Sequence, residues 1–304
     1  MNRSEKIKGN IALLFTAIIW GSGFIGQKLG LGSLPPLALN GSRHLVSALI
    51  LIPVGYWMIR RNGYIDEKAE GLDEVRRRKK LLFQGSLICG TFLALGTNMQ
   101  QAGLQWINAG QSGFITTLYV IIVPFFGTFL GLKIPRKIWG CAAVAIVGFG
   151  LLSLKGQMGI SPGVWLTLGC AVAFSVEMLA IDRFVTPRNA VALSAGQMLV
   201  AAVISIILSL IFEDATMAQL AAGAPVILYL ALVPTTLGYT LQIVGQGHTE
   251  PTVASLLLSL ESVFAAIFGA LILGETMSLR EIGGCALIFA SIVVAQLPEK
   301  ERGK

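Results

Sequence analysis

Residues 190–212 read AVALSAGQMLVAAVISIILSLIF and contain no charged residue. A helix needs roughly 20 mostly apolar residues to cross a hydrocarbon core of about 30 Å. The stretch therefore predicts a helix that spans a membrane, with lipid as the surroundings of at least this part of the chain.

The rest of the chain has the same character. Its 304 residues are 54% hydrophobic and only 13% charged, with a mean hydropathy of +0.74, which is too apolar for a soluble domain of this size. Breaks at Gly, Pro and charge clusters predict an all-α polytopic membrane protein with ten transmembrane helices. The predicted spans are 9–29, 36–59, 81–101, 108–131, 137–154, 162–182, 190–212, 224–246, 252–273 and 280–297.

Basic residues collect on one side of these spans. If the N-terminus is cytoplasmic, the cytoplasmic segments hold all of the 23 Lys and Arg residues except Lys28, Arg43, Lys155 and Arg280. Cytoplasmic loops are enriched in Lys and Arg, so we expect a multi-pass protein of the inner (plasma) membrane with both termini cytoplasmic. The same asymmetry explains the net charge of +7 without a nucleic-acid partner, because the basic residues form no aromatic-studded face.

Motifs of other protein classes do not occur in the sequence. The four cysteines lie inside apolar runs without CxxC spacing, which predicts neither disulfides nor a zinc site. The two histidines lie far apart, and HExxH, Walker and GxSxG patterns are absent. We therefore expect no cofactor, no metal and no enzymatic activity.

The spans form two similar sets. Three shifts of the chain align residues of the first half with identical residues of the second, in the same helix order. They are Leu39, Leu45, Val46 and Ala48 with Leu193, Leu199, Val200 and Ala202 at a shift of 154; Leu95, Gly96, Gln100 and Gly103 with Leu237, Gly238, Gln242 and Gly245 at 142; and Gly140, Cys141 and Ala142 with Gly284, Cys285 and Ala286 at 144.

Each set holds five spans, so the second set must enter the membrane from the opposite side. We therefore expect two inverted five-helix repeats, residues 1–158 and 159–304, related by a two-fold axis in the membrane plane. Carriers that work by alternating access use this arrangement. The alternative is a chance coincidence of Gly, Leu and Ala in an apolar chain.

Three sequence features follow one another along the chain. They are Ile19-Trp20-Gly21-Ser22-Gly23-Phe24, then Arg43, then Leu273-Gly274-Glu275 followed by Leu279 and Gly283-Gly284. In these features the chain resembles the drug/metabolite transporter superfamily, and specifically its ten-helix EamA-type members, over essentially its whole length. The resemblance implies a secondary transporter that works without ATP hydrolysis, often an exporter of amino acids or other metabolites. It names no substrate.

The first half departs from the family pattern at one place. Leu130-Gly131-Leu132-Lys133-Ile134-Pro135 stands where the first half of the family often has a Gly-Glu pair as well. A role shared symmetrically by two such glutamates is therefore in question for this chain.

Few ionisable residues lie inside the predicted spans, where each costs about 3 kcal/mol on insertion scales. Glu177 lies past the middle of 162–182, and Glu261 lies near the middle of 252–273. Loss of water disfavours the charged form of a carboxyl group, so both are candidates to bind a proton or a cationic substrate in turn. Glu177 is also similar in position to the single membrane carboxylate of the small multidrug-resistance branch of the superfamily, which exchanges protons for cations.

Each candidate has a structural alternative. Either carboxylate could form a permanent ion pair with Arg43 that fixes helix packing, and Glu177 could instead accept hydrogen bonds from Ser or Thr neighbours. Arg43 could clamp a substrate carboxylate through two hydrogen bonds, which would suit an amino acid or an organic anion. Its alternative is an architectural pairing.

Rings and amides inside the predicted spans complete the candidate cavity, because binding cavities combine aromatic walls with a few polar groups. Tyr119 occupies the repeat position of Glu261, and simple packing is the alternative for each ring. Pro124 and Pro234 should kink their spans. The candidate cavity residues are Trp20, Arg43, Asn98, Gln100, Tyr119, Tyr239 and Gln242.

These observations predict a carrier with a small-molecule substrate and a central cavity between the halves, exporting amino acids or related compounds. The alternative is proton-coupled export of multiple drugs or cationic compounds. A channel and a membrane-embedded enzyme are less favoured. Spans 137–154 and 280–297 should pack at the periphery or at the surface of a homodimer, which the sequence leaves open.

Overall fold

The computed structural model describes residues 3–107, 109–153, 161–273 and 278–296. Gly274 and Glu275 of the resemblance, and the predicted boundary between residues 158 and 159, lie outside these ranges. Within them the regular structure is entirely helical. The helices are α1 (Arg3–Gly30), α2 (Pro36–Arg61), α3 (Glu67–Glu70), α4 (Leu72–Gly103), α5 (Ala109–Thr116), α6 (Tyr119–Phe129), α7 (Arg136–Ser153), α8 (Pro162–Phe184), α9 (Ala190–Phe212), α10 (Met217–Ala222), α11 (Ala224–Leu230), the π-helical turn η1 (Ala231–Gly238), α12 (Tyr239–Gln246), α13 (Pro251–Leu258), α14 (Glu261–Leu273) and α15 (Leu279–Gln296).

Eight helical segments of the described residues are long and apolar enough to cross a membrane. Each coincides with one of the predicted spans. They are Ser4–Gly30, Pro36–Arg61, Leu72–Gly103, Ser112–Phe129, Pro162–Phe184, Ala190–Phe212, Ala224–Gln246 and Pro251–Phe268. The remaining two predicted spans correspond to α7 and α15, whose crossing of the membrane stays a prediction.

Two of the spans are interrupted near their middle. The chain tightens between α5 and α6, where the Leu118 amide donates to the Ile115 carbonyl over 3.2 Å. It tightens in the same way between α13 and α14, where the Leu260 amide donates to the Leu257 carbonyl over 3.2 Å. The interruption lies just before Tyr119, whereas Pro124 lies within α6, and the kink expected at Pro124 stays a prediction.

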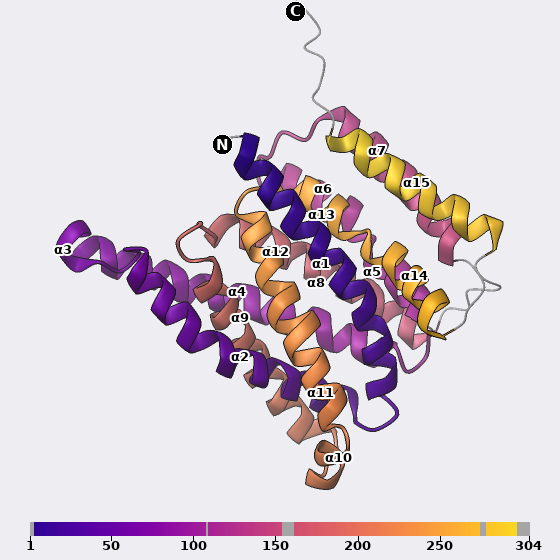
Figure 1. Cartoon of the computed structure of the whole chain (residues 1–304), viewed down its shortest axis with the longest axis horizontal. Coiled ribbons are helices and arrows are strands. Elements are labelled where there is room, and N and C mark those ends of the chain that lie inside the picture. The colour runs from indigo at the N-terminus through magenta and orange to yellow at the C-terminus, as the bar shows by residue number, and fades with distance from the viewer. Residues whose placement is uncertain (1–2, 108, 154–160, 274–277, 297–304) are drawn as a thin grey trace, which may run out of the picture.

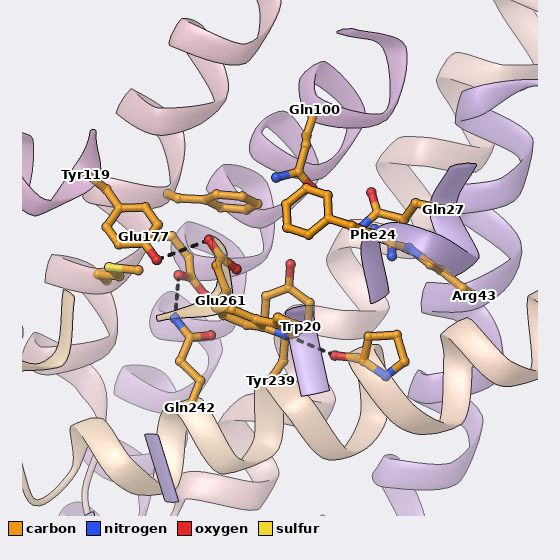
Figure 2. Close-up of a pocket in the computed structure, with 13 residues that line it drawn as sticks. Trp20, Phe24, Gln27, Arg43, Gln100, Tyr119, Glu177, Tyr239, Gln242 and Glu261 are labelled. Carbon is orange, nitrogen blue, oxygen red and sulfur yellow. Dashed lines mark hydrogen bonds between the residues drawn. The ribbon is translucent and has the colours of Figure 1, made fainter. Parts of the chain in front are cut away.

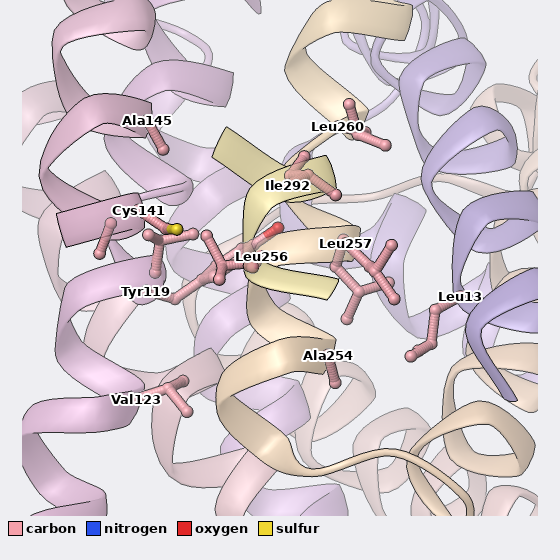
Figure 3. Close-up of a cluster of buried hydrophobic side chains, with 14 of the residues drawn as sticks. Leu13, Tyr119, Val123, Cys141, Ala145, Ala254, Leu256, Leu257, Leu260 and Ile292 are labelled. Carbon is pink, nitrogen blue, oxygen red and sulfur yellow. The ribbon is translucent and has the colours of Figure 1, made fainter. Parts of the chain in front are cut away.

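Close helix contacts organise the bundle (Figure 1). α2 packs along α9, α4 lies against both α8 and α9, and α1 contacts α12 and α14. α7 and α15 pack on each other along one edge of the molecule (Figure 1). The largest apolar cluster lies between them and the ends of α6 and α13, and includes Leu13, Val123, Leu256 and Leu257 (Figure 3).

The loops at one end of the bundle are joined by polar contacts. The Arg78 guanidinium binds Glu70 and Glu74, each over 2.9 Å, and the Asn189 side chain donates to the Tyr64 hydroxyl over 3.3 Å. The segment between α2 and α4 therefore contacts the turn between α8 and α9.

Candidate functional site

A cavity lies at the centre of the helical bundle (Figure 2). Its volume is about 30 Å³, compared with at least about 300 Å³ in typical small-molecule sites. In this conformation the cavity is therefore too small to hold a metabolite. The lining residues are Trp20, Phe24, Gln27, Arg43, Gln100, Tyr119, Phe174, Glu177, Met178, Pro234, Tyr239, Gln242 and Glu261.

Both predicted carboxyl groups face this cavity, and each has one amide or phenol donor. The Gln242 Nε2 group donates to Glu177 Oε2 over 3.1 Å, and the Tyr119 hydroxyl donates to Glu261 Oε1 over 3.1 Å (Figure 2). Glu177 is 1% exposed and Glu261 is 4% exposed. The other oxygen of Glu177, Oε1, is buried without a hydrogen-bond partner among the described groups.

Arg43 lies on the opposite side of the cavity from the carboxyl groups (Figure 2). It is 2% exposed, and its Nε has no hydrogen-bond partner among the described groups. The ion pairs of the described residues include neither Arg43 nor the two carboxylates. The alternative of a permanent Arg43 ion pair is thus not realised in this conformation, which leaves a buried cation and two buried acids in one cavity.

Aromatic rings line the cavity between Arg43 and the two carboxyl groups. Trp20 and Tyr239 lie with their ring centroids 4.8 Å apart, and Figure 2 places Tyr239 between Glu261 and Arg43. The indole N–H of Trp20 donates to the Pro234 carbonyl over 3.1 Å. That donor is therefore engaged by the protein backbone in this conformation.

Two predicted amides differ in their placement. Gln100 lines the cavity and donates to the Thr116 hydroxyl over 3.1 Å. Asn98 lies outside the lining: it accepts from Asn40 Nδ2 and donates to Ser205 Oγ, each over 2.9 Å. Asn98 thus connects α2, α4 and α9, a structural role that its position in a span did not distinguish from a cavity role.

Sequence reasoning missed four lining residues, Phe24, Gln27, Phe174 and Met178. Phe24 lies four residues after Trp20, and Gln27 lies seven residues after it. Helical spacing would therefore have placed all three on the same face. Phe174 is the counterpart of Trp20 at the shift of 154 that aligned the halves. Pro234 was expected to kink its span, and it lies in η1 and lines the cavity.

Metal chemistry finds no support in the described part of the chain. No group of three or more His, Cys, Asp or Glu side chains there is arranged to hold a metal ion. The ionisable side chains that line the cavity are Arg43, Glu177 and Glu261, together with the phenols of Tyr119 and Tyr239.

Comparison with known proteins gives the family. The model of the EamA-like transporter family matches residues 7–154 and again residues 161–296. An uncharacterized transporter of Archaeoglobus fulgidus is 28% identical over 96% of this chain and 87% of its own length. A protein of Salmonella typhimurium named a probable amino-acid metabolite efflux pump is 27% identical over 94% of both chains.

Two further comparisons concern the membrane location of a relative and the fold of a solved structure. The uncharacterized inner membrane transporter YedA of Escherichia coli is 25% identical over 94% of this chain and 90% of its own. A crystal structure covering 97% of both chains superposes with a TM-score of 0.74 at 19% identity, which supports the fold alone. With its apolar helices, the chain is thus a multi-pass membrane protein and a transporter, not an enzyme, and it belongs to the EamA-like transporter family.

Proposed function

We propose that this chain is an alternating-access carrier that exports amino acids or related metabolites. The observation that carries the proposal is the small central cavity, which holds a buried guanidinium on one side and two buried carboxyl groups on the other. An amino acid offers a carboxylate for Arg43 and an ammonium for Glu177 or Glu261. The Salmonella relative named a probable amino-acid metabolite efflux pump is consistent with this substrate class.

The architecture proposed for the carrier is ten spans in two inverted repeats, residues 1–158 and 159–304. The two matches of the family model support the duplication. Antiparallel packing of α2 and α9 supports the inversion: a Cβ on Gly41 would meet Ile206, whereas one on Gly55 would meet Ala192. Because these two helices are counterparts in the proposed repeat, their opposite directions are what an inverted repeat requires.

Matched details of the two halves support the same architecture. The interruptions before Tyr119 and before Glu261 occur at counterpart positions of the 142 shift, with the same amide-to-carbonyl spacing. The Tyr119 hydroxyl also donates a hydrogen bond to the Glu261 carboxyl group, so these two counterpart residues meet at the cavity. Interrupted helices in transporters commonly border the binding region, where the half-helices move relative to one another.

Two pairs of glycines lie where helices cross closely. A Cβ added to Gly9 of α1 would lie 3.0 Å from the Gly245 carbonyl oxygen of α12, and one added to Gly163 of α8 would lie 2.7 Å from the Gly103 carbonyl oxygen of α4. The pairs are counterparts in the proposed repeat. Closely packed small residues let membrane helices approach and cross, so each pair supplies a pivot for one half.

The proposed coupling assigns proton binding to Glu177 and Glu261, and the remaining lining residues to substrate contact. Membrane location is proposed as the inner membrane with both termini cytoplasmic. The start of α1 and the end of α15 lie toward the same end of the bundle, which an even number of crossings requires (Figure 1). A homodimer stays a prediction that cross-linking in native membranes would test.

Transport in proteoliposomes tests the proposal. The purified protein should exchange a labelled amino acid in a saturable way, and an imposed pH gradient should drive its accumulation. Glu177→Gln and Glu261→Gln should each lower gradient-driven flux by at least about tenfold, corresponding to about 1.4 kcal/mol. The exposed Glu250 at the start of α13 provides the matched control, since Glu250→Gln should transport normally.

Two outcomes would contradict different parts of the proposal. Absence of flux across a panel of amino acids would overturn the substrate class. Normal gradient-driven flux in both glutamine variants would overturn the coupling residues and leave the fold untouched.

Proton-coupled export of cationic compounds is the second candidate. It is favoured by the presence of two carboxyl groups in one cavity, because two acids can hold a cation or protons in turn. Ethidium flux that survives Arg43→Gln, with no amino-acid flux in the wild type, would select this candidate over the first.

A further inference from the structure

One helical span that borders the cavity changes its winding in the middle. The segment Ala224–Gln246 contains the π-helical turn η1, and Pro234 lies inside this turn. π-helical turns accommodate an extra residue and are frequent at functional sites. In the first half of the chain the corresponding stretch of α4 is uninterrupted α-helix.

α1 packs tightly against η1. A Cβ on Gly238 would lie 2.7 Å from Trp20 Nε1, and a Cβ on Gly23 would lie 3.1 Å from the Pro234 side chain. Both glycines therefore permit a helix approach that a larger residue would prevent. The indole of Trp20 lies directly on the end of the π-helical turn.

Trp20 satisfies a backbone carbonyl of that turn. Its Nε1 donates to the Pro234 carbonyl over 3.1 Å, while the Tyr239 amide donates to the carbonyls of Thr235 and Thr236. The Thr16 hydroxyl, one turn earlier on α1, lies 3.3 Å from the Gly238 carbonyl and 3.0 Å from the Ala12 carbonyl of its own helix. Its single proton is shared, so Trp20 is the stronger of the two contacts.

The counterpart positions in the other half lack these donors. Phe174 lies against Gly96, where a Cβ would be 2.5 Å from the phenyl ring, just as Trp20 lies against Gly238. A phenyl ring has no N–H group. The counterpart of Thr16 is Cys170, whose Sγ lies 3.9 Å from the Thr116 hydroxyl. The same ring seat thus exists twice, and a donor is present only where the opposing helix has a π-helical turn.

The turn controls two side chains of the cavity. Tyr239 immediately follows η1 and pairs its ring with Trp20, and Gln242 follows one turn later and donates to Glu177. One residue of α-helix corresponds to a rotation of about 100°. Rewinding η1 as α-helix would therefore rotate α12 relative to α11 and remove Gln242 from Glu177.

We propose that Trp20, assisted by Thr16, is a positioning residue whose indole N–H holds η1 in its π-helical form and thereby keeps Gln242 against Glu177. Trp20 then acts on transport through the winding of η1 rather than through an N–H contact with substrate. The effect on transport rests on the proposed function above, whereas the effect on η1 is independent of it.

Hydrogen exchange in lipid nanodiscs tests the structural part. Trp20→Phe, which gives α1 the ring found at the counterpart seat, should speed amide exchange in residues 231–242 by about tenfold and leave residues 89–100 of α4 unchanged. Thr16→Val should do the same to a smaller extent. The matched controls are Phe174→Leu, which should leave residues 231–242 unchanged, and Thr167→Val, which removes a hydroxyl that donates to the Gly163 carbonyl of its own helix. Unchanged exchange of 231–242 in Trp20→Phe, or equal acceleration of both segments, would overturn the proposal.

Transport of a labelled amino acid separates positioning from substrate contact. Pro234→Ala restores the backbone N–H, so the π-helical turn is no longer enforced in that variant. Trp20→Phe should lower the maximal rate about tenfold in the wild type and cause no further loss in the Pro234→Ala variant. A rise in KM of equal size in both backgrounds would instead indicate that the indole N–H contacts substrate. If no amino acid is transported at all, the proposed function fails, and the exchange experiment still decides the role of Trp20.

Discussion

α4 and the α11–η1–α12 segment are counterparts in the proposed repeat, yet they differ in helical winding and in their side-chain hydrogen bonds to other helices. α4 is one continuous helix, and its Asn98 connects it to Asn40 of α2 and Ser205 of α9. The α11–η1–α12 segment contains a π-helical turn, and its Thr240, the counterpart of Asn98, makes one side-chain bond, with Ser194 over 2.9 Å. In the proposed carrier, α4 would therefore serve as a support, and the α11–η1–α12 segment would be the element that can change its winding.

A second contrast lies at the two interrupted spans. Tyr119 begins α6 and Glu261 begins α14, and the phenol of one donates to the carboxyl group of the other. The positions are equivalent in the proposed repeat, but only Glu261 is a carboxylic acid. At this pair of counterpart positions, the first half supplies a phenol and the second half supplies a carboxyl group, and the two side chains meet at the cavity.

Exchanging these two side chains should give the largest effect. Glu261→Tyr removes a carboxyl group from the cavity, so it should lower amino-acid exchange in proteoliposomes about 100-fold, or about 2.7 kcal/mol. The double variant Tyr119→Glu with Glu261→Tyr rebuilds the same hydrogen-bonded pair with its members reversed. It should therefore recover to within about tenfold of the wild type.

The single variant Tyr119→Glu is the control for this exchange, because it places two acids together without a phenol donor and should remain impaired. If the double variant transports no better than Glu261→Tyr, the two positions are not interchangeable. The equivalence of the two interrupted spans at the cavity would then be lost.

The glycine crossings should give the next largest effect, and a similar one in both halves. Gly9→Val would place side-chain atoms against the Gly245 carbonyl, and Gly163→Val would place them against the Gly103 carbonyl. Overpacking of this kind costs about 1–3 kcal/mol, which corresponds to a fall in the melting temperature of roughly 2–12 °C. The measurement is thermal unfolding in detergent. Gly140 of α7, whose Cβ would meet nothing within 4 Å, provides the control. A fall confined to one crossing would show that the halves differ here too.

The sequence predicted the eight long apolar helical segments and most of the residues that line the cavity, because both depend on local signals. Uncharged stretches of about 20 residues define the spans, and isolated ionisable residues such as Glu177 and Glu261 stand out within them. Arg43 was recognised for the same reason, and eight of the nine candidate residues line the cavity.

The role of Asn98 and the π-helical turn could not be predicted, because both depend on how the helices pack against each other. The hydrogen bonds that Asn98 makes to two other helices could not be distinguished from a cavity role, since both place a polar residue inside a span. The π-helical turn likewise had no signal beyond Pro234. Pro124, an equally plausible kink, lies inside α6, and the interruption precedes it at Tyr119. Phe174, in contrast, was accessible through the repeat, because the shift that aligns Leu39 with Leu193 also aligns it with Trp20.

The polar bridges between helices should give the smallest effect and the clearest difference between the halves. Asn98→Leu breaks bonds to Asn40 and Ser205, whereas Thr240→Val breaks one bond to Ser194. Interhelical hydrogen bonds in membranes contribute about 0.6 kcal/mol each, so the losses should be about 1–2 kcal/mol and about 0.6 kcal/mol. Melting temperatures in detergent should fall by roughly 2–8 °C for Asn98→Leu and by roughly 1–2 °C for Thr240→Val. Because Asn98 lies outside the cavity, its variant should keep the KM of the wild type. A raised KM with unchanged stability would place Asn98 with the substrate-contacting residues, and α4 would then no longer be the passive support of the two copies.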